Sequence, residues 1–208
     1  MRTQTKITQE NLTSKDAYHI LVEGNKRFTQ NLKAERNLKD QVLETSKGQY
    51  PFAVILSCID SRVPAELVFD QGIGDIFSVR VAGNIVNEDI LGSIEYACKV
   101  AGSKIVVVMG HTKCGAVTAA CQNVALGNIT SLLSKIKPAV EFIKKDDKEM
   151  ISDSIERVAV QNVRLSIERI RNESPILFEM EKKGEIEIVG AIYDVTKGQV
   201  EFLEACEV

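Results

Sequence analysis

Residues 52–62 read Phe-Ala-Val-Ile-Leu-Ser-Cys-Ile-Asp-Ser-Arg, and residues 105–115 read Ile-Val-Val-Val-Met-Gly-His-Thr-Lys-Cys-Gly. In both stretches a short apolar run gives way to turn residues, which is typical of a buried parallel strand followed by a loop. Ligands of open α/β sheets bind at the carboxyl ends of the strands. The sequence therefore predicts that the residues just after these two runs meet at one edge of a parallel sheet.

Helical patterns alternate with strand patterns along the rest of the chain, as they do in α/β folds with a mostly parallel central sheet flanked by helices. The pattern of residues 76–81 predicts another strand, and the amphipathic pattern of residues 152–171 predicts a long helix. Residues 186–193 and 199–203 are separated by a Thr-Lys-Gly turn, so they predict a hairpin and an antiparallel edge strand near the C-terminus. No internal boundary is visible, and we expect a single domain over residues 1–208.

A helical arm is expected before the first strand, over about residues 13–49. Thr13-Ser14-Lys15-Asp16 has the form of a capping box, which predicts a helix from there to about Leu32. The charged and polar stretch from Lys33 to Gln49 is expected to be a connector without regular structure.

Composition narrows the class of protein. The 208 residues are 44% hydrophobic and 26% charged, as in ordinary globular proteins, and the formal net charge is −3. That charge gives no electrostatic support for a nucleic-acid or membrane partner, and no apolar stretch is long enough to span a bilayer. The first ten residues are polar and lack the apolar core of a signal peptide. The odd count of five cysteines argues against a disulfide framework. We therefore expect a cytoplasmic protein, or a periplasmic one if a signal peptide has been removed.

Cys58, His111 and Cys114 carry the metal chemistry. Cysteine and histidine are zinc ligands, and three protein ligands with one open position describe a catalytic zinc site. His111 and Cys114 are three residues apart, a spacing that lets both reach one metal, whereas only the sheet topology connects Cys58 to them. Taken singly, Cys58 could be a buried structural thiol and His111 an ordinary loop histidine.

Asp60 and Arg62 add a second layer to this site. A carboxylate two residues from a zinc thiolate can bind the metal or accept a proton from metal-bound water, and an arginine fork can hold that carboxylate at two points. The alternative is a solvated surface ion pair, worth about 0–1 kcal/mol.

These motifs resemble those of the β-class carbonic anhydrases, and the resemblance extends over nearly the whole chain. Cys58-x-Asp60-x-Arg62 and His111-x-x-Cys114-Gly115 are similar to that family's zinc signatures. Further resembling segments are Gly24-Asn25-x-Arg27-Phe28, Asp70-Gln71-Gly72, Gly74-Asp75-Ile76-Phe77, Arg80-Val81-Ala82-Gly83-Asn84, Gly92-Ser93-Ile94-Glu95-Tyr96-Ala97 and Gly190-Ala191-Ile192-Tyr193-Asp194.

The resemblance implies reversible hydration of carbon dioxide to bicarbonate and a proton, through a hydroxide on one Zn²⁺ per chain. Cys58, His111 and Cys114 would bind the metal, with Asp60 either a fourth ligand or a hydrogen-bond acceptor held by Arg62. It also implies that Gln71 helps to bind carbon dioxide or bicarbonate. Gly115 would offer a backbone N–H, or simply permit close packing. A homodimer or a dimer of dimers is implied as the assembly.

Two other functions are compatible with the same residues. Carbonyl sulfide and carbon disulfide hydrolases share this scaffold and zinc site. A non-catalytic, zinc-stabilised scaffold protein would need only a closed four-ligand site. The combination of Asp60, Arg62 and Gln71 argues against that second possibility, because a purely structural site does not need such an outer layer.

Overall fold

The structure is a computed structural model that describes residues 3–145 and 152–204. Its elements follow one another as α1 (Lys6–Asn11), α2 (Ser14–Thr29), α3 (Leu38–Thr45), β1 (Ala53–Ser57), α4 (Ala65–Val68), β2 (Ile76–Arg80), the 3-10 turn η1 (Ala82–Asn84), α5 (Glu88–Glu95), the π-helical turn η2 (Tyr96–Val100), β3 (Ile105–His111), α6 (Gly115–Cys121), α7 (Gly127–Ser134), α8 (Lys137–Lys144), α9 (Ser152–Glu173), α10 (Pro175–Lys182), β4 (Glu187–Tyr193) and β5 (Val200–Phe202).

A five-stranded sheet in the order β2-β1-β3-β4-β5 forms the centre of the molecule. The first four strands run parallel, and only β5 is antiparallel, to β4. This arrangement confirms the predicted α/β class and its antiparallel C-terminal edge strand. β1 and β3 are buried along their whole length, because both lie inside the sheet and helices cover both faces.

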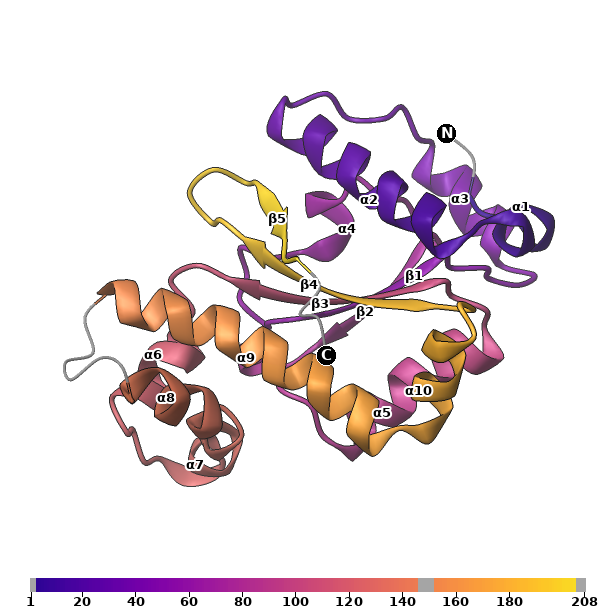
Figure 1. Cartoon of the computed structure of the whole chain (residues 1–208). Coiled ribbons are helices and arrows are strands. Elements are labelled where there is room, and N and C mark those ends of the chain that lie inside the picture. The colour runs from indigo at the N-terminus through magenta and orange to yellow at the C-terminus, as the bar shows by residue number, and fades with distance from the viewer. Residues whose placement is uncertain (1–2, 146–151, 205–208) are drawn as a thin grey trace.

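Side chains that alternate along the strands supply two separate cores. Val54 and Leu56 point to the face covered by α5, α9 and α10, whereas Ala53 and Ile55 point to the face covered by α2 and α4. Figure 1 shows these two layers on opposite sides of the sheet. A third apolar cluster lies among α6, α7, α8 and the first half of α9.

The N-terminal arm differs in part from the expectation. Thr13 caps α2 and forms the predicted capping box with Asp16. The stretch expected to be an unstructured connector contains α3, whose N-cap Asn37 accepts hydrogen bonds from the amides of Lys39 and Asp40. Strong capping thus produces a short helix where the apolar pattern was too weak to predict one. None of the helices in the described residues is both long and apolar enough to cross a membrane.

Candidate metal centre

Sheet register brings the two sequence segments together. Ser57 at the end of β1 is aligned with Met109 of β3, so Cys58 leaves the sheet within about one residue of His111. β3 continues to His111, two residues beyond the apolar run that ends at Met109, which places the imidazole on the last residue of the strand. The chain then turns through Thr112 and Lys113, and Cys114 becomes the N-cap of α6.

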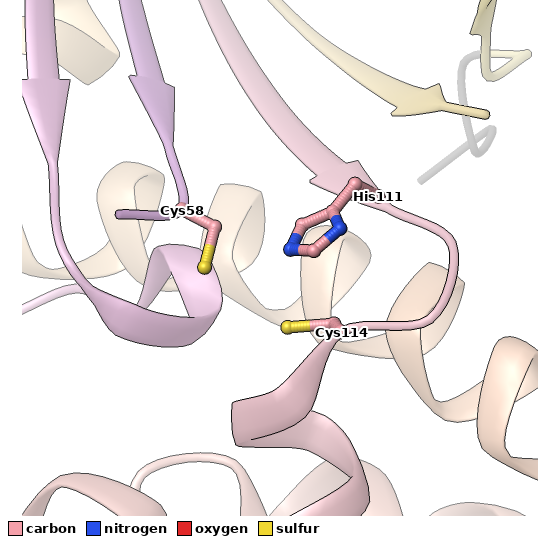
Figure 2. A group of neighbouring side chains, drawn as sticks. All are labelled: Cys58, His111 and Cys114. Carbon is pink, nitrogen blue, oxygen red and sulfur yellow. The ribbon is translucent and has the colours of Figure 1, made fainter. Parts of the chain in front are cut away.

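Cys58, His111 and Cys114 form one compact group. Their ligand atoms all lie within 4.8 Å of one another, and all three residues are buried. Figure 2 shows both sulfur atoms and the imidazole pointing toward a common centre, from the end of β1, the end of β3 and the start of α6. A spacing this short allows a single ion to be bound by all three side chains.

His111 is held in the tautomer that can bind a metal through Nε2. His111 Nδ1 lies 2.9 Å from the carbonyl oxygen of Thr112. A carbonyl only accepts, so Nδ1 carries the proton and Nε2 is left with a free lone pair. Nε2 is fully buried, and no described residue makes a hydrogen bond to it. A buried nitrogen lone pair beside two thiols is costly without a partner, and zinc is the partner that this donor set fits.

The two thiols influence each other's ionisation. The hydrogen bond from Cys114 lowers the pKa of Cys58, and burial opposes this while His111 and the amide of Gly83 assist it. The same contact with Cys58, together with burial, raises the pKa of Cys114. The pair therefore holds one negative charge readily. Both thiols must lose their protons to bind a metal, so binding is coupled to proton release.

Asp60 lies beside this group rather than inside it. Its Oδ2 is 4.0 Å from His111 Nε2, and Arg62 holds the carboxylate at two points, with Nε 2.9 Å from Oδ1 and Nη2 2.8 Å from Oδ2. The hydrogen bonds from Arg62 hold the pKa of Asp60 well below its usual range, although partial burial opposes the shift. Asp60 is 18% exposed and Arg62 47%, so this pair lies between the buried ligands and solvent.

The structure does not bring Gln71 to the same group. Gln71 follows α4 and lies beside Gly24 of α2, on which a built Cβ would come within 3.1 Å of Gln71 Nε2. The Gln71 amide donates to the Phe69 carbonyl at 2.6 Å. Gly115 does begin α6 directly after Cys114, but a Cβ on it would meet nothing within 4 Å, so close packing does not explain this glycine.

Several residues around the centre were not singled out from the sequence. Arg80 donates to the carbonyls of Cys58 and Asp60 at 3.1 and 2.7 Å, and the Gly83 amide donates to Cys58 Sγ at 3.3 Å. Asn162 and Glu156 of α9 hold backbone groups near the two thiols. The one signal for Asn162 was a polar side chain between Ala159 and Val163 on the apolar side of a long amphipathic helix.

The fold and the buried Cys₂His group together define a mononuclear zinc enzyme site at the carboxyl ends of parallel strands. The model of the family "Carbonic anhydrase" matches residues 53–200. Carbonic anhydrase 2 of Mycobacterium tuberculosis is 34% identical over 189 residues, which are 88% of this chain and 89% of that protein. A carbonic anhydrase of Mycolicibacterium smegmatis is 34% identical over 192 residues, covering 89% of this chain and 91% of the relative.

Solved structures agree with these relatives. The β-carbonic anhydrase CafA of Aspergillus fumigatus superposes with a TM-score of 0.75 at 27% identity, covering 93% of this chain and 92% of that one. The chain belongs to the carbonic anhydrase family, and within it to the β class. Members of this family are zinc lyases that hydrate carbon dioxide reversibly, so the expected activity and cofactor are confirmed.

Proposed function

We propose that each chain hydrates carbon dioxide at one zinc ion held by Cys58, His111 and Cys114, with Asp60 and Arg62 controlling the open side of the site. The observation that carries this assignment is the buried Nε2 of His111, which faces two thiols and has no other described hydrogen-bond partner. Two thiolates and a neutral imidazole neutralise a divalent ion, so the buried centre has no net charge to stabilise.

When bound, zinc acts as a Lewis acid and lowers the pKa of a coordinated water from about 15.7 toward about 7. The chain's own residues then orient the reactants. Asp60 is an ionised carboxylate 4.0 Å from His111 Nε2, and its Oδ2 is placed to accept a hydrogen bond or a proton from the attacking water. Arg62 keeps Asp60 ionised and fixes its orientation through two hydrogen bonds.

The same geometry gives Asp60 two competing partners. Its carboxylate is held by Arg62 here, and the alternative is direct binding to zinc as a fourth ligand. Since the Arg62 fork contacts both oxygens and fixes the orientation of the carboxylate, moving Asp60 onto the metal would strain or break these bonds. We propose that the state held by Arg62 is the active one.

Gly115 and Gln71 have less direct roles. The amide of Gly115 lies at the start of α6, where backbone N–H groups are available to hydrogen-bond a ligand's oxygen. Gln71 lies beside α2 rather than in the group formed by Cys58, His111 and Cys114 of its own chain. It keeps its proposed role in substrate binding only if an assembly brings residues 69–72 of one chain to the site of another.

We further propose that the single domain, with its N-terminal arm, assembles as a homodimer or a dimer of dimers. Leu38, Val42 and Leu43 of α3 are 56%, 52% and 64% exposed, an apolar cluster that a second copy would cover. A reducing compartment such as the cytoplasm is proposed because all four cysteines that the structure describes are free.

The deciding experiment is a stopped-flow, pH-indicator assay of carbon dioxide hydration. We expect turnover by the purified protein, loss of turnover after zinc is removed with a chelator, and recovery when zinc is added back. A parallel assay with carbon disulfide distinguishes the hydrolase activity known on this scaffold. A protein that binds zinc stoichiometrically but hydrates no carbon dioxide would contradict the proposal.

A further inference from the structure

Helix α9 packs against the end of β3, where the proposed zinc ligands begin. Gly110 precedes His111, and a Cβ built on Gly110 would come within 2.8 Å of Val163 Cγ2 and 3.6 Å of the Ala159 carbonyl oxygen. The absence of a side chain at Gly110 therefore allows the helix to pack directly against the strand. Figure 1 shows α9 crossing the lower face of the sheet toward α6. This contact brings polar side chains of α9 within reach of both thiol-bearing loops.

The first of these side chains is Glu156, whose Oε1 accepts a hydrogen bond from the Lys113 amide at 2.9 Å. Lys113 lies between His111 and Cys114 in the sequence and adopts the left-handed backbone conformation, with φ 55°. A non-glycine residue adopts this conformation at a cost in free energy. The Lys113 carbonyl accepts from Arg62 Nη2 at 3.3 Å. The backbone N–H and the backbone carbonyl of Lys113 are thus both held by residues outside this loop. These two bonds fix the position of Cys114 relative to His111.

The second side chain is Asn162, which is buried six residues further along α9. Its Nδ2 donates to the Gly83 carbonyl oxygen at 2.8 Å. The amide of the same Gly83 donates to Cys58 Sγ at 3.3 Å. Gly83 has φ 68°, and a Cβ there would come within 2.6 Å of Ile136, so this turn has little freedom to adjust. Asn162 therefore orients a residue whose N–H points at one of the two sulfur atoms.

We propose that Glu156 and Asn162 are positioning residues of the metal centre, through which α9 sets the distance between Cys114 and Cys58 and directs the Gly83 N–H at the Cys58 sulfur. This inference rests on the proposed zinc site. One helix contacts both loops, since Glu156 holds the Lys113 amide and Asn162 holds the Gly83 carbonyl. The two side chains are about 9 Å apart along the helix axis, at about 1.5 Å of rise per residue. Groups that orient metal ligands commonly change metal affinity about 10–100-fold when removed.

The test measures zinc affinity by competition with a chromophoric chelator, and the absorption spectrum of the Co²⁺-substituted protein. We expect Glu156→Ala and Asn162→Leu each to weaken zinc binding by about 10-fold or more. Asn162→Leu is also expected to shift the sulfur-to-cobalt charge-transfer band to lower energy, because the Cys58 thiolate loses an oriented hydrogen bond. Glu156→Gln keeps an oxygen that accepts from the Lys113 amide, so it is expected to restore most of the affinity.

Ile170→Val serves as the control for general destabilisation, since Ile170 is fully buried in the same helix and distant along it from both loops. It is expected to lower thermal stability without changing zinc affinity or the cobalt spectrum. If Asn162→Leu does not fold, Asn162→Ser replaces it, because the shorter side chain loses the bond with less disturbance. Zinc affinity and spectra equal to those of Ile170→Val would overturn the inference. A wild-type protein that binds no zinc would instead contradict the proposed function.

Discussion

Arg62 holds the carboxylate of Asp60 at two points, Nε to Oδ1 at 2.9 Å and Nη2 to Oδ2 at 2.8 Å, and it also donates to the Lys113 carbonyl at 3.3 Å. One guanidinium thus connects the loop after β1 to the loop after β3. The two loops carry Cys58 and Cys114 respectively. Because the fork occupies both carboxylate oxygens, its removal would free Asp60 to turn toward the metal.

Replacing Arg62 with alanine is expected to abolish most activity while zinc stays bound. The Asp60 carboxylate would lose its orientation, and we expect kcat/KM to fall by about 100-fold or more. The measurement pairs zinc content with hydration rate from about pH 6.5 to about pH 9, over which the wild-type rate should rise. Arg62→Lys keeps the charge but not the fork and should be intermediate. Wild-type rates in Arg62→Ala would show that the pair is only a surface ion pair.

Removing one thiol should remove the metal. Cys58→Ala is expected to lose zinc and activity together and to lower the unfolding temperature of the protein, because zinc binds only the native state. Cys98→Ala is the matched control, since Cys98 is equally buried but outside the group, and burial raises its pKa to about 12. Elemental analysis after gel filtration provides the comparison. Full zinc content in Cys58→Ala would reject this set of ligands.

Asp70 is expected to make the fold sensitive to acid. Burial raises the pKa of Asp70, but hydrogen bonds from Arg27 and Arg36 and from the Ala34 amide outweigh this, so the pKa is lowered overall. Arg27 Nε lies 2.6 Å from Oδ2, and Arg36 Nη1 lies 2.5 Å from Oδ1. Since the folded-state pKa lies below the unfolded value of about 3.9, the stabilisation is complete above that pH. It is lost as pH falls through the folded-state value.

The substitution Asp70→Asn tests whether the ionised Asp70 carboxylate stabilises the folded protein. The substitution should cost about 3 kcal/mol at neutral pH, because the largely buried Arg36 guanidinium and the partly exposed Arg27 guanidinium lose their counter-charge. Urea unfolding of the two proteins, repeated from about pH 7 down to about pH 3, gives the difference in the free energy of unfolding. We expect that difference to shrink toward the acid end. A difference that is constant over this range would mean that the Asp70 charge does not stabilise the fold.

Gly24 allows α2 to contact the carbonyl that ends α4. A Cβ on Gly24 would come within 1.8 Å of the Phe69 carbonyl oxygen, a distance that only backbone movement can relieve. Gly24→Ala is therefore expected to destabilise the protein by about 1–3 kcal/mol or more, despite the better helix propensity of alanine. Glu23→Ala changes an exposed neighbour on the same helix and should stay within about 0.5 kcal/mol of wild type. Equal unfolding midpoints for the two variants would contradict this packing.

The proposed dimer should depend on α3. Sedimentation equilibrium is expected to give at least twice the 23.0 kDa of one chain. Val42→Glu with Leu43→Glu should shift the protein toward monomer, because two charges would be buried in the interface. Phe142→Glu alters an apolar side chain that is 49% exposed on α8 and should leave the mass unchanged. A wild-type mass of 23 kDa with full activity would defeat the proposal.

The sequence alone pointed to the α/β architecture and to the three residues that the structure brings together as a possible metal site. Runs such as residues 52–56 and 105–109 are apolar without alternation, which is typical of a strand covered on both faces. Once both runs are parallel strands, topology requires Cys58 and His111 to leave the sheet on the same side. α3 was missed because capping by Asn37, rather than an apolar stripe, marks its start.

Only the tertiary structure decided which residues surround Cys58, His111 and Cys114. Cys58, Gly83, Lys113 and Asn162 are far apart in the chain, and the hydrogen bonds that α9 makes with Lys113 and Gly83 depend on where that helix lies on the sheet. No local pattern encodes such contacts, because hydrogen bonds to backbone groups do not depend on which side chain the partner residue carries. Gln71 likewise could be matched to a motif, whereas its position beside Gly24 of α2 follows only from how α2 and α4 pack.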